Sequence, residues 1–123
     1  MAKKVISYDL LFEVKDTLGR RIHTTKDYWQ KIKTLKHREL KYGINEVKTT
    51  LTKPDEIRRS VTDSTILLYA QRQQNYDILI VAVKVLNGEG FLVTVYQTKD
   101  YKKKGELIWP KQKQRLALSE AEG

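Results

Sequence analysis

The stretch that decides the fold reads Asp77-Ile-Leu-Ile-Val-Ala-Val-Lys-Val-Leu86, then Asn87-Gly-Glu-Gly90, then Phe91-Leu-Val-Thr-Val-Tyr-Gln-Thr98. Two runs rich in Val and Ile flank a short connection that contains glycine, which is a pattern typical of a β-hairpin. Each run is far shorter than the about 20 apolar residues that a membrane-spanning helix needs. The stretch therefore predicts the central hairpin of an antiparallel sheet.

The length of the hairpin loop decides which residues share a face, because a slip of one residue exchanges the two faces of a strand. A two-residue turn at Asn87 and Gly88 places Lys84 on the face opposite Thr94 and Tyr96. A three-residue loop at 88–90 places all three on one face. The three-residue loop sorts the apolar residues better and is the register we predict, with Gly90 supplying a positive φ. Its dry face holds Leu79, Val81, Val83, Val85, Phe91, Val93 and Val95, and its mixed face holds Lys84, Thr94, Tyr96 and Thr98 among Ile78, Ile80, Ala82 and Leu92.

The remaining patterns, in chain order, predict an α+β domain. Strands are expected at 5–14 and 21–24, and Thr24 or Thr25 is expected to cap a helix. A second helix should cover 45–51, before Pro54. Further strands are expected around Ile57 and at 65–71, and 107–109 should dock on the domain. The predicted fold is two N-terminal helices packed on an antiparallel sheet of four to six strands. The first helix should bury Tyr28, Trp29, Ile32 and Leu35.

Length and composition limit the functional classes. A chain of 123 residues predicts one domain, here residues 1–110, followed by a polar tail at 111–123. The chain has no cysteine, which excludes disulfides, thiol catalysis and thiolate metal sites. Its two histidines are too few for a histidine metal cage, so we expect no metal and no cofactor. The first residues show no signal-peptide pattern, which favours a cytoplasmic location.

The charge points to a polyanionic partner. The formal net charge is +9, and residues 20–41 contain eight Lys or Arg against two acidic residues. Residues 99–115 contain seven Lys or Arg against two acidic residues. Basic segments of this density favour nucleic acid over a membrane as the partner, with an ordinary solvated surface as the alternative.

No motif of a nucleotide hydrolase, serine hydrolase or zinc peptidase is present. The candidate site residues are dispersed. His37 has a side chain that titrates near neutral pH and suits proton transfer, or it is a surface residue at a helix end. Arg58 offers a planar fork for phosphate, or it is part of a solvated connector. Lys84 interrupts an apolar run, and it either serves a site or extends its amine to solvent.

These residues, in this order, resemble a known family. The resemblance covers roughly residues 26–109 and is carried by Trp29, by His37, by Pro54-Asp-Glu-Ile-Arg-Arg-Ser60, by Tyr69 and by the hairpin strands. It is to the phage-type branch of the barnase–EndoU–colicin–RelE-like (BECR) superfamily of metal-independent RNases. One departure is that Arg38 follows His37, where the family often has proline.

The resemblance implies a small toxin-like or phage-derived RNA endonuclease. The implied reaction is attack of a ribose 2′-hydroxyl on the adjacent phosphate, without a metal. His37 or Tyr96 would transfer protons, and Arg58 and Lys84 would hold the phosphate. Ser60, Tyr69 and Thr94 would position the substrate, and a cognate inhibitor or antitoxin protein would be a partner. The alternative is a catalytically inactive RNA-binding or protein-interaction module of the same fold.

Overall fold

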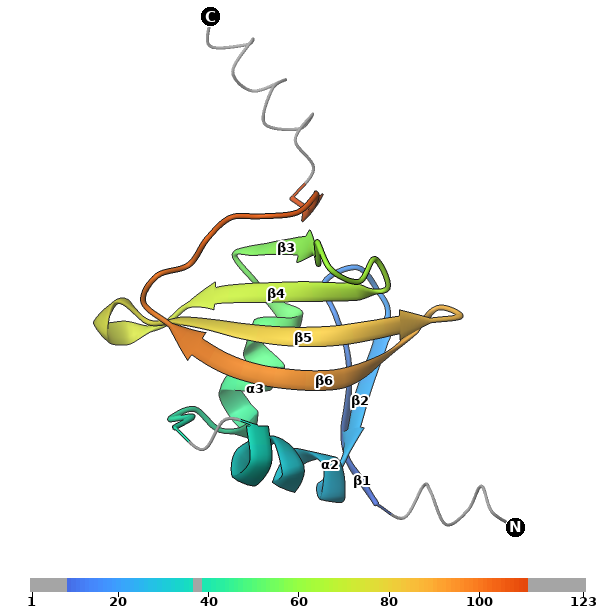
Figure 1. The fold of residues 1–123 in the computed structure, drawn as a ribbon. Coiled ribbons are helices and arrows are strands. Elements are labelled where there is room, and N and C mark those ends of the chain that lie inside the picture. Colours follow the sequence, from blue (N-terminus) through green and yellow to red (C-terminus); the bar gives the residue numbers. More distant parts are fainter. Residues whose placement is uncertain (1–8, 37–38, 111–123) are drawn as a thin grey trace, which may run out of the picture.

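A computed structural model of the protein describes residues 9–36 and 39–110, which form an α+β fold around a seven-stranded mixed sheet (Figure 1). The strand order is β1-β2-β6-β5-β4-β3-β7. The strands are β1 (Leu10–Lys15), β2 (Arg21–Thr25), β3 (Glu56–Arg59), β4 (Ile66–Arg72), β5 (Ile78–Leu86), β6 (Glu89–Thr98) and β7 (Leu107–Trp109). The helical elements are α2 (Lys26–Lys31), the π-helical turn η1 (Ile32–Lys36), α3 (Ile44–Thr52) and the 3₁₀ turn η2 (Gln74–Tyr76).

The sheet differs from the predicted one in strand number and direction. The predicted sheet was antiparallel with four to six strands, whereas β2 pairs with β6 in parallel and β7 adds an edge beside β3. In the chain, the two α-helices lie between β2 and β3, after two strands as predicted. The β1–β2 hairpin covers the free edge of β6, whose backbone groups would otherwise lack partners. The pairing of β2 with β6 joins segments far apart in the sequence, so no turn motif could predict it.

The central hairpin forms as predicted, but its loop is the shorter alternative. Leu86 pairs with Glu89, so the turn consists of Asn87 and Gly88, with φ of 53° and 82°. Asn-Gly is the pair best suited to a two-residue turn with positive φ at both positions. The three-residue loop was therefore wrong, and Gly90 has no positive φ.

A β-bulge then restores the predicted sharing of a face. Ala82 pairs with Thr94 but Val83 pairs with Leu92, so Val93 is an extra residue in β6. Beyond this bulge the pairing has the alternation that a three-residue loop would have given. Lys84, Thr94 and Tyr96 thus share one face, as predicted. Phe91 and Leu92 are exchanged relative to the prediction: Phe91 is 39% exposed and Leu92 is 3% exposed.

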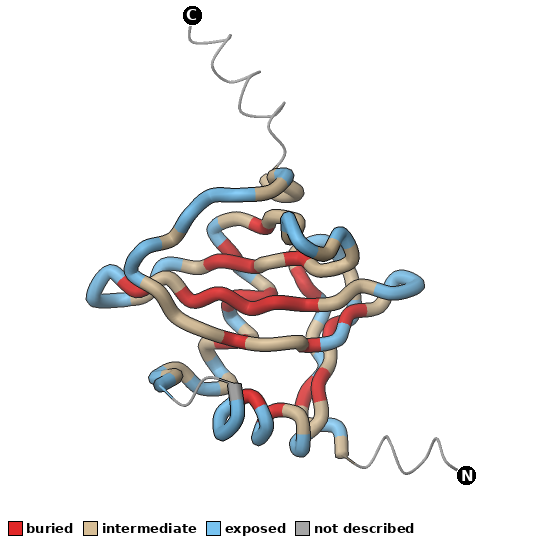
Figure 2. Tube along the Cα trace, in the orientation of Figure 1, coloured by how far each residue is buried: buried red, intermediate tan, exposed pale blue. Residues whose placement is uncertain are grey.

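The core lies between the sheet and the helices. Figure 1 shows α3 crossing behind β4, β5 and β6, with α2 below, and Figure 2 shows buried residues along β4 and β5. Leu35 is 76% exposed, so its predicted place in the buried stripe was wrong. The π-helical turn η1 has a longer repeat than an α-helix and carries Leu35 off the apolar side. The buried cluster includes Ile22, Trp29, Ile32, Val47, Leu51, Tyr69, Leu79, Val81, Val83, Leu92 and Val95.

The side of β3–β6 turned away from α3 is called the outer face here. Residues 99–106, called the strap, leave the end of β6, pass the ends of β5 and β4, and reach β7 at the edge of the sheet (Figure 1). Tyr101 of the strap donates a hydrogen bond to Glu56, and Arg58 donates one to the carbonyl of Gly105. The strap therefore holds lysines over the outer face. The predicted tail at 111–123 lies outside the described residues.

Candidate nucleic-acid interface

The outer face carries four of the seven predicted site residues. Arg58 pairs with Leu68, Leu68 with Ala82, and Ala82 with Thr94, so Arg58 and Thr94 lie in one row across four strands. Three strand spacings of about 4.8 Å separate them by roughly 14 Å. Lys84 belongs to the next row, towards the hairpin turn, beside Phe91. These side chains share a surface but do not surround one phosphate.

Arg58 is part of a polar cluster between β3 and the strap. Its Nε donates to Oε2 of Glu56 at 2.6 Å, and its NH1 donates to the carbonyl of Gly105 at 2.9 Å. The hydroxyl of Tyr101 donates to the same carboxylate oxygen of Glu56. The Arg58 and Glu56 side chains are only 17% and 14% exposed. The guanidinium is therefore oriented by protein groups.

The electrostatics of this cluster keep each group in a defined state. Burial alone would raise the pKa of the Glu56 carboxyl, but hydrogen bonds from Arg58 and Tyr101 outweigh it and hold that pKa below its usual value. Burial and the bond to Glu56 raise the pKa of the Tyr101 hydroxyl. At neutral pH the cluster thus contains a carboxylate, a guanidinium and a protonated phenol.

A hollow of about 360 Å³ opens beside the cluster, lined by Glu56, Tyr101, Arg72 and Lys103 among others. Arg72 and Lys103 are two further cations in the wall of this hollow, where they are available to an anionic ligand. Neither Glu56 nor Tyr101 was a predicted site residue. Glu56 lies two residues before Arg58, the spacing that puts both on one face of a strand, so the sequence did contain a signal. Tyr101 carried no such signal.

Tyr96 and Ser60 line a second hollow, of about 260 Å³, between the outer face and the strap. Burial raises the pKa of the Tyr96 hydroxyl, so this group is protonated at neutral pH. The Ser60 hydroxyl lies 3.1 Å from that of Thr62. The buried hydroxyl of Thr94 has no hydrogen-bond partner among the residues that the structure describes.

One predicted residue, Tyr69, is not brought to this surface. Tyr69 is fully buried on the core face, where its hydroxyl donates to the carboxylate of Asp16. Asp16 also accepts from the backbone amides of Leu18 and Arg20 at 2.9 and 2.7 Å, so Tyr69 helps to fix the β1–β2 turn. His37 lies outside the described residues.

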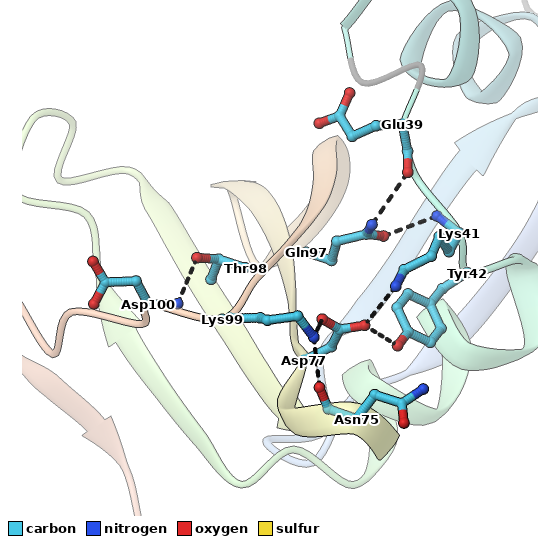
Figure 3. Close-up of polar contacts among 9 residues, drawn as sticks. All are labelled: Glu39, Lys41, Tyr42, Asn75, Asp77, Gln97, Thr98, Lys99 and Asp100. Carbon is cyan, nitrogen blue, oxygen red and sulfur yellow. Dashed lines mark hydrogen bonds and ion pairs between the residues drawn. The ribbon is translucent and has the colours of Figure 1, made fainter.

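The carboxylate of Asp77 is a centre of polar contacts that the sequence did not announce (Figure 3). Its side chain is 3% exposed and accepts from Lys99 at 2.8 Å and from the Tyr42 hydroxyl at 2.6 Å. The ammonium of Lys41 lies 3.1 Å away, and the amide of Gln97 accepts from the backbone of Lys41 at 2.8 Å. Bonds from Lys99 and Tyr42 hold the pKa of Asp77 well below its usual value. This network fixes the start of the strap against the segment before α3.

Comparisons with family models, with curated proteins and with solved structures found no match to this chain. Within residues 9–36 and 39–110, no helix is long and apolar enough to cross a membrane. The same residues contain no group of three or more His, Asp or Glu side chains arranged to hold a metal ion.

Proposed function

We propose that this protein binds single-stranded RNA along the outer face of its sheet. The observation that carries the proposal is the composition of that face. It combines cations, aromatic rings and small hollows on a rigid sheet, and α3 packs on the other side (Figure 1). The strap adds lysines at 99, 102, 103 and 104.

Two general properties of RNA recognition support this assignment. Lysine and arginine contacts to phosphate supply affinity that does not depend on sequence, and a net charge of +9 favours approach of a polyanion. Sequence-tolerant binding of single strands also uses aromatic side chains on which bases stack. Phe91 is 39% exposed on the outer face, and Tyr96 lines a hollow beside the strap. A purely ionic surface would need neither ring.

The direct test is the salt dependence of RNA binding. Each phosphate neutralised on a single strand contributes about −0.7 to the slope of log affinity against log salt. Replacing Lys102, Lys103 and Lys104 together by Gln should make the slope shallower by about 2, since three contacts at 0.7 each are removed. The matched control replaces Lys15, Lys31 and Lys33, which change the charge equally but lie on β1, α2 and η1.

The control variant should bind almost as the wild type does. Equal losses in both triple variants would mean that net charge alone attracts RNA and that the outer face has no special role. Affinity that is flat between low and physiological salt would refute the proposal and favour a protein-interaction domain.

A second candidate function is metal-independent cleavage of the bound RNA, and the Glu56–Arg58–Tyr101 cluster favours it. Glu56 would accept the proton of the 2′-hydroxyl as this oxygen attacks phosphorus. Tyr101 would protonate the departing 5′-oxygen, and Arg58 would stabilise the charge of the phosphorane. The products are a 2′,3′-cyclic phosphate and a free 5′-hydroxyl. The roles given to His37, Lys84 and Tyr96, the toxin-like character and the inhibitor partner stay predictions from the family resemblance.

Cleavage is tested with one labelled RNA in EDTA and a DNA of the same sequence, which lacks the attacking hydroxyl. Arg58→Met and Glu56→Gln should each lose about 10²–10³ in rate, as when a group that stabilises transition-state charge is removed. Lys84→Met and His37→Ala, purified in parallel, test the other predicted groups. Equal cleavage by every variant would identify a contaminating nuclease. Intact RNA binding without cleavage would refute the cleavage function and leave RNA binding as the proposed function.

A further inference from the structure

A third hollow, of about 340 Å³, lies where β2 runs parallel to β6. Its lining includes His23, Thr25, Tyr28, Lys84 and Phe91. Glu56, Arg58 and Tyr101 do not belong to this lining. Its volume is at the lower end of the range of about 300–1,000 Å³ for small-ligand sites, which suits one planar group rather than a large ligand.

The β-bulge in β6 is what gives this hollow its aromatic wall. Without the extra residue Val93, the alternation of the strand would leave Phe91 in the core and Leu92 outside. With it, Phe91 is 39% exposed while Leu92 is 3% exposed. The hydroxyl of Tyr28 donates to the carbonyl of Val93 at 2.8 Å and so anchors the bulge. Bulges of this kind commonly re-aim a side chain beside a functional site.

The Phe91 ring is held in place from one side. The His23 ring meets it edge to face, with centroids 4.6 Å apart and planes inclined at 76°. Both residues sit on paired strands, so their backbones are fixed by the sheet. An aromatic ring held this way loses little freedom when a second planar group stacks on it.

A cation stands directly beside the ring. Lys84 is the cross-strand partner of Phe91 in β5, and it forms no ion pair with any residue that the structure describes. Lys84 acts through space on Asp63, where it contributes to lowering the pKa of the carboxyl. An exposed aromatic ring with a lysine beside it combines the two features that bind single strands, a stacking surface for a base and a positive charge for a phosphate.

We infer that this hollow is a subsite for a single unstacked nucleobase of RNA, which stacks on Phe91 while its flanking phosphate binds Lys84. The inference rests on the proposed RNA-binding function and adds where one base is recognised. It also separates the roles of two neighbours: Phe91 contributes affinity that is independent of salt, and Lys84 contributes affinity that depends on it.

The test measures the fluorescence anisotropy of a short labelled oligoadenylate as the protein is titrated into it, at several salt concentrations. Base–aromatic stacking is worth about 1–3 kcal/mol, so Phe91→Ala should weaken binding by about 5- to 140-fold at 1.4 kcal/mol per tenfold. Its salt slope should equal that of the wild type. Lys84→Met should instead make the slope shallower by about 0.7. Phe91→Trp should restore affinity, and Phe91→Leu, which keeps apolar area but has no ring, should not.

Tyr76→Ala is the matched aromatic control, because Tyr76 is 87% exposed in η2 at the other end of β5. Circular dichroism confirms that each variant is folded. Salt-dependent binding that is unchanged in Phe91→Ala, or lowered equally in Tyr76→Ala, overturns the subsite and leaves the proposed function standing. Full affinity in Phe91→Leu also overturns it, because an apolar anchor for a protein partner would behave that way. Absence of any RNA binding refutes the proposed function itself.

Discussion

Gly90 offers the sharpest test of how β2 and β6 pack. A Cβ atom at this position would lie 2.4 Å from Cδ1 of Ile22 and 2.7 Å from Cγ1 of Val83. Ordinary contacts between carbon atoms are about 3.5–4.0 Å. Ile22 and Val83 are both fully buried, so neither side chain has free space to move into. Gly90 therefore permits the close parallel approach of β2, and Gly90→Ala forces the strands or side chains to shift.

Two opposing effects set the expected change in the free energy of unfolding of Gly90→Ala. Overpacking a buried site costs about 1–3 kcal/mol. Restricting the unfolded chain by replacing glycine returns about 0.4–1 kcal/mol. The net loss of unfolding free energy should thus be about 1–2 kcal/mol, measured by urea denaturation with the fluorescence of the buried Trp29 as the signal. The m-value, which is the slope of the unfolding free energy against urea concentration, should not change.

A double-mutant cycle makes the test specific to the contact. Ile22→Val removes the Cδ1 atom and alone should cost about 0.5–1.5 kcal/mol. In the Gly90→Ala protein it should cost clearly less, because it relieves the closest overlap. Gly88→Ala is the control: it is strained by its φ of 82° but has no neighbour within 4 Å, so Ile22→Val should not relieve it. A neutral Gly90→Ala, or strict additivity with Ile22→Val, would refute the packing argument.

Two further predictions concern buried carboxylates. Asp77→Asn should lower stability at neutral pH; because the folded pKa of Asp77 lies below its usual 3.8, this difference should be complete above about pH 5 and shrink as the pH falls through the folded value. Unfolding of both proteins followed from neutral to acidic pH checks this, and a gap that widens in acid would contradict the assigned network. Tyr69→Phe removes the hydroxyl that donates to Asp16 and should cost about 1.5–3 kcal/mol, the range for a hydrogen bond to a charged group. It should leave RNA binding unchanged, since Tyr69 faces the core; a selective loss of binding would show that it acts at the outer face after all.

The outer face could be predicted only in part from the sequence. Arg58, Lys84, Thr94 and Tyr96 were selected by residue type and by alternation, and alternation correctly placed the last three on one face. Alternation carries no information about which strands lie between two residues. The sequence therefore suggested one compact phosphate site, whereas the structure spreads these groups over β3–β6. One partner of Arg58, the carbonyl of Gly105, comes from the strap, which no local pattern could place against the sheet.

The sequence by itself determined the local elements of this protein. Alternating Val and Ile runs specify β5 and β6, Pro54 ends the region in which α3 can extend, and Asn87-Gly88 specifies a tight turn, because each depends on backbone preferences within a few residues. Only the tertiary structure decided the bulge at Val93, the parallel pairing of β2 with β6 and the outward turn of Phe91. These features depend on contacts between segments distant in the chain, where packing and backbone pairing outweigh local preference.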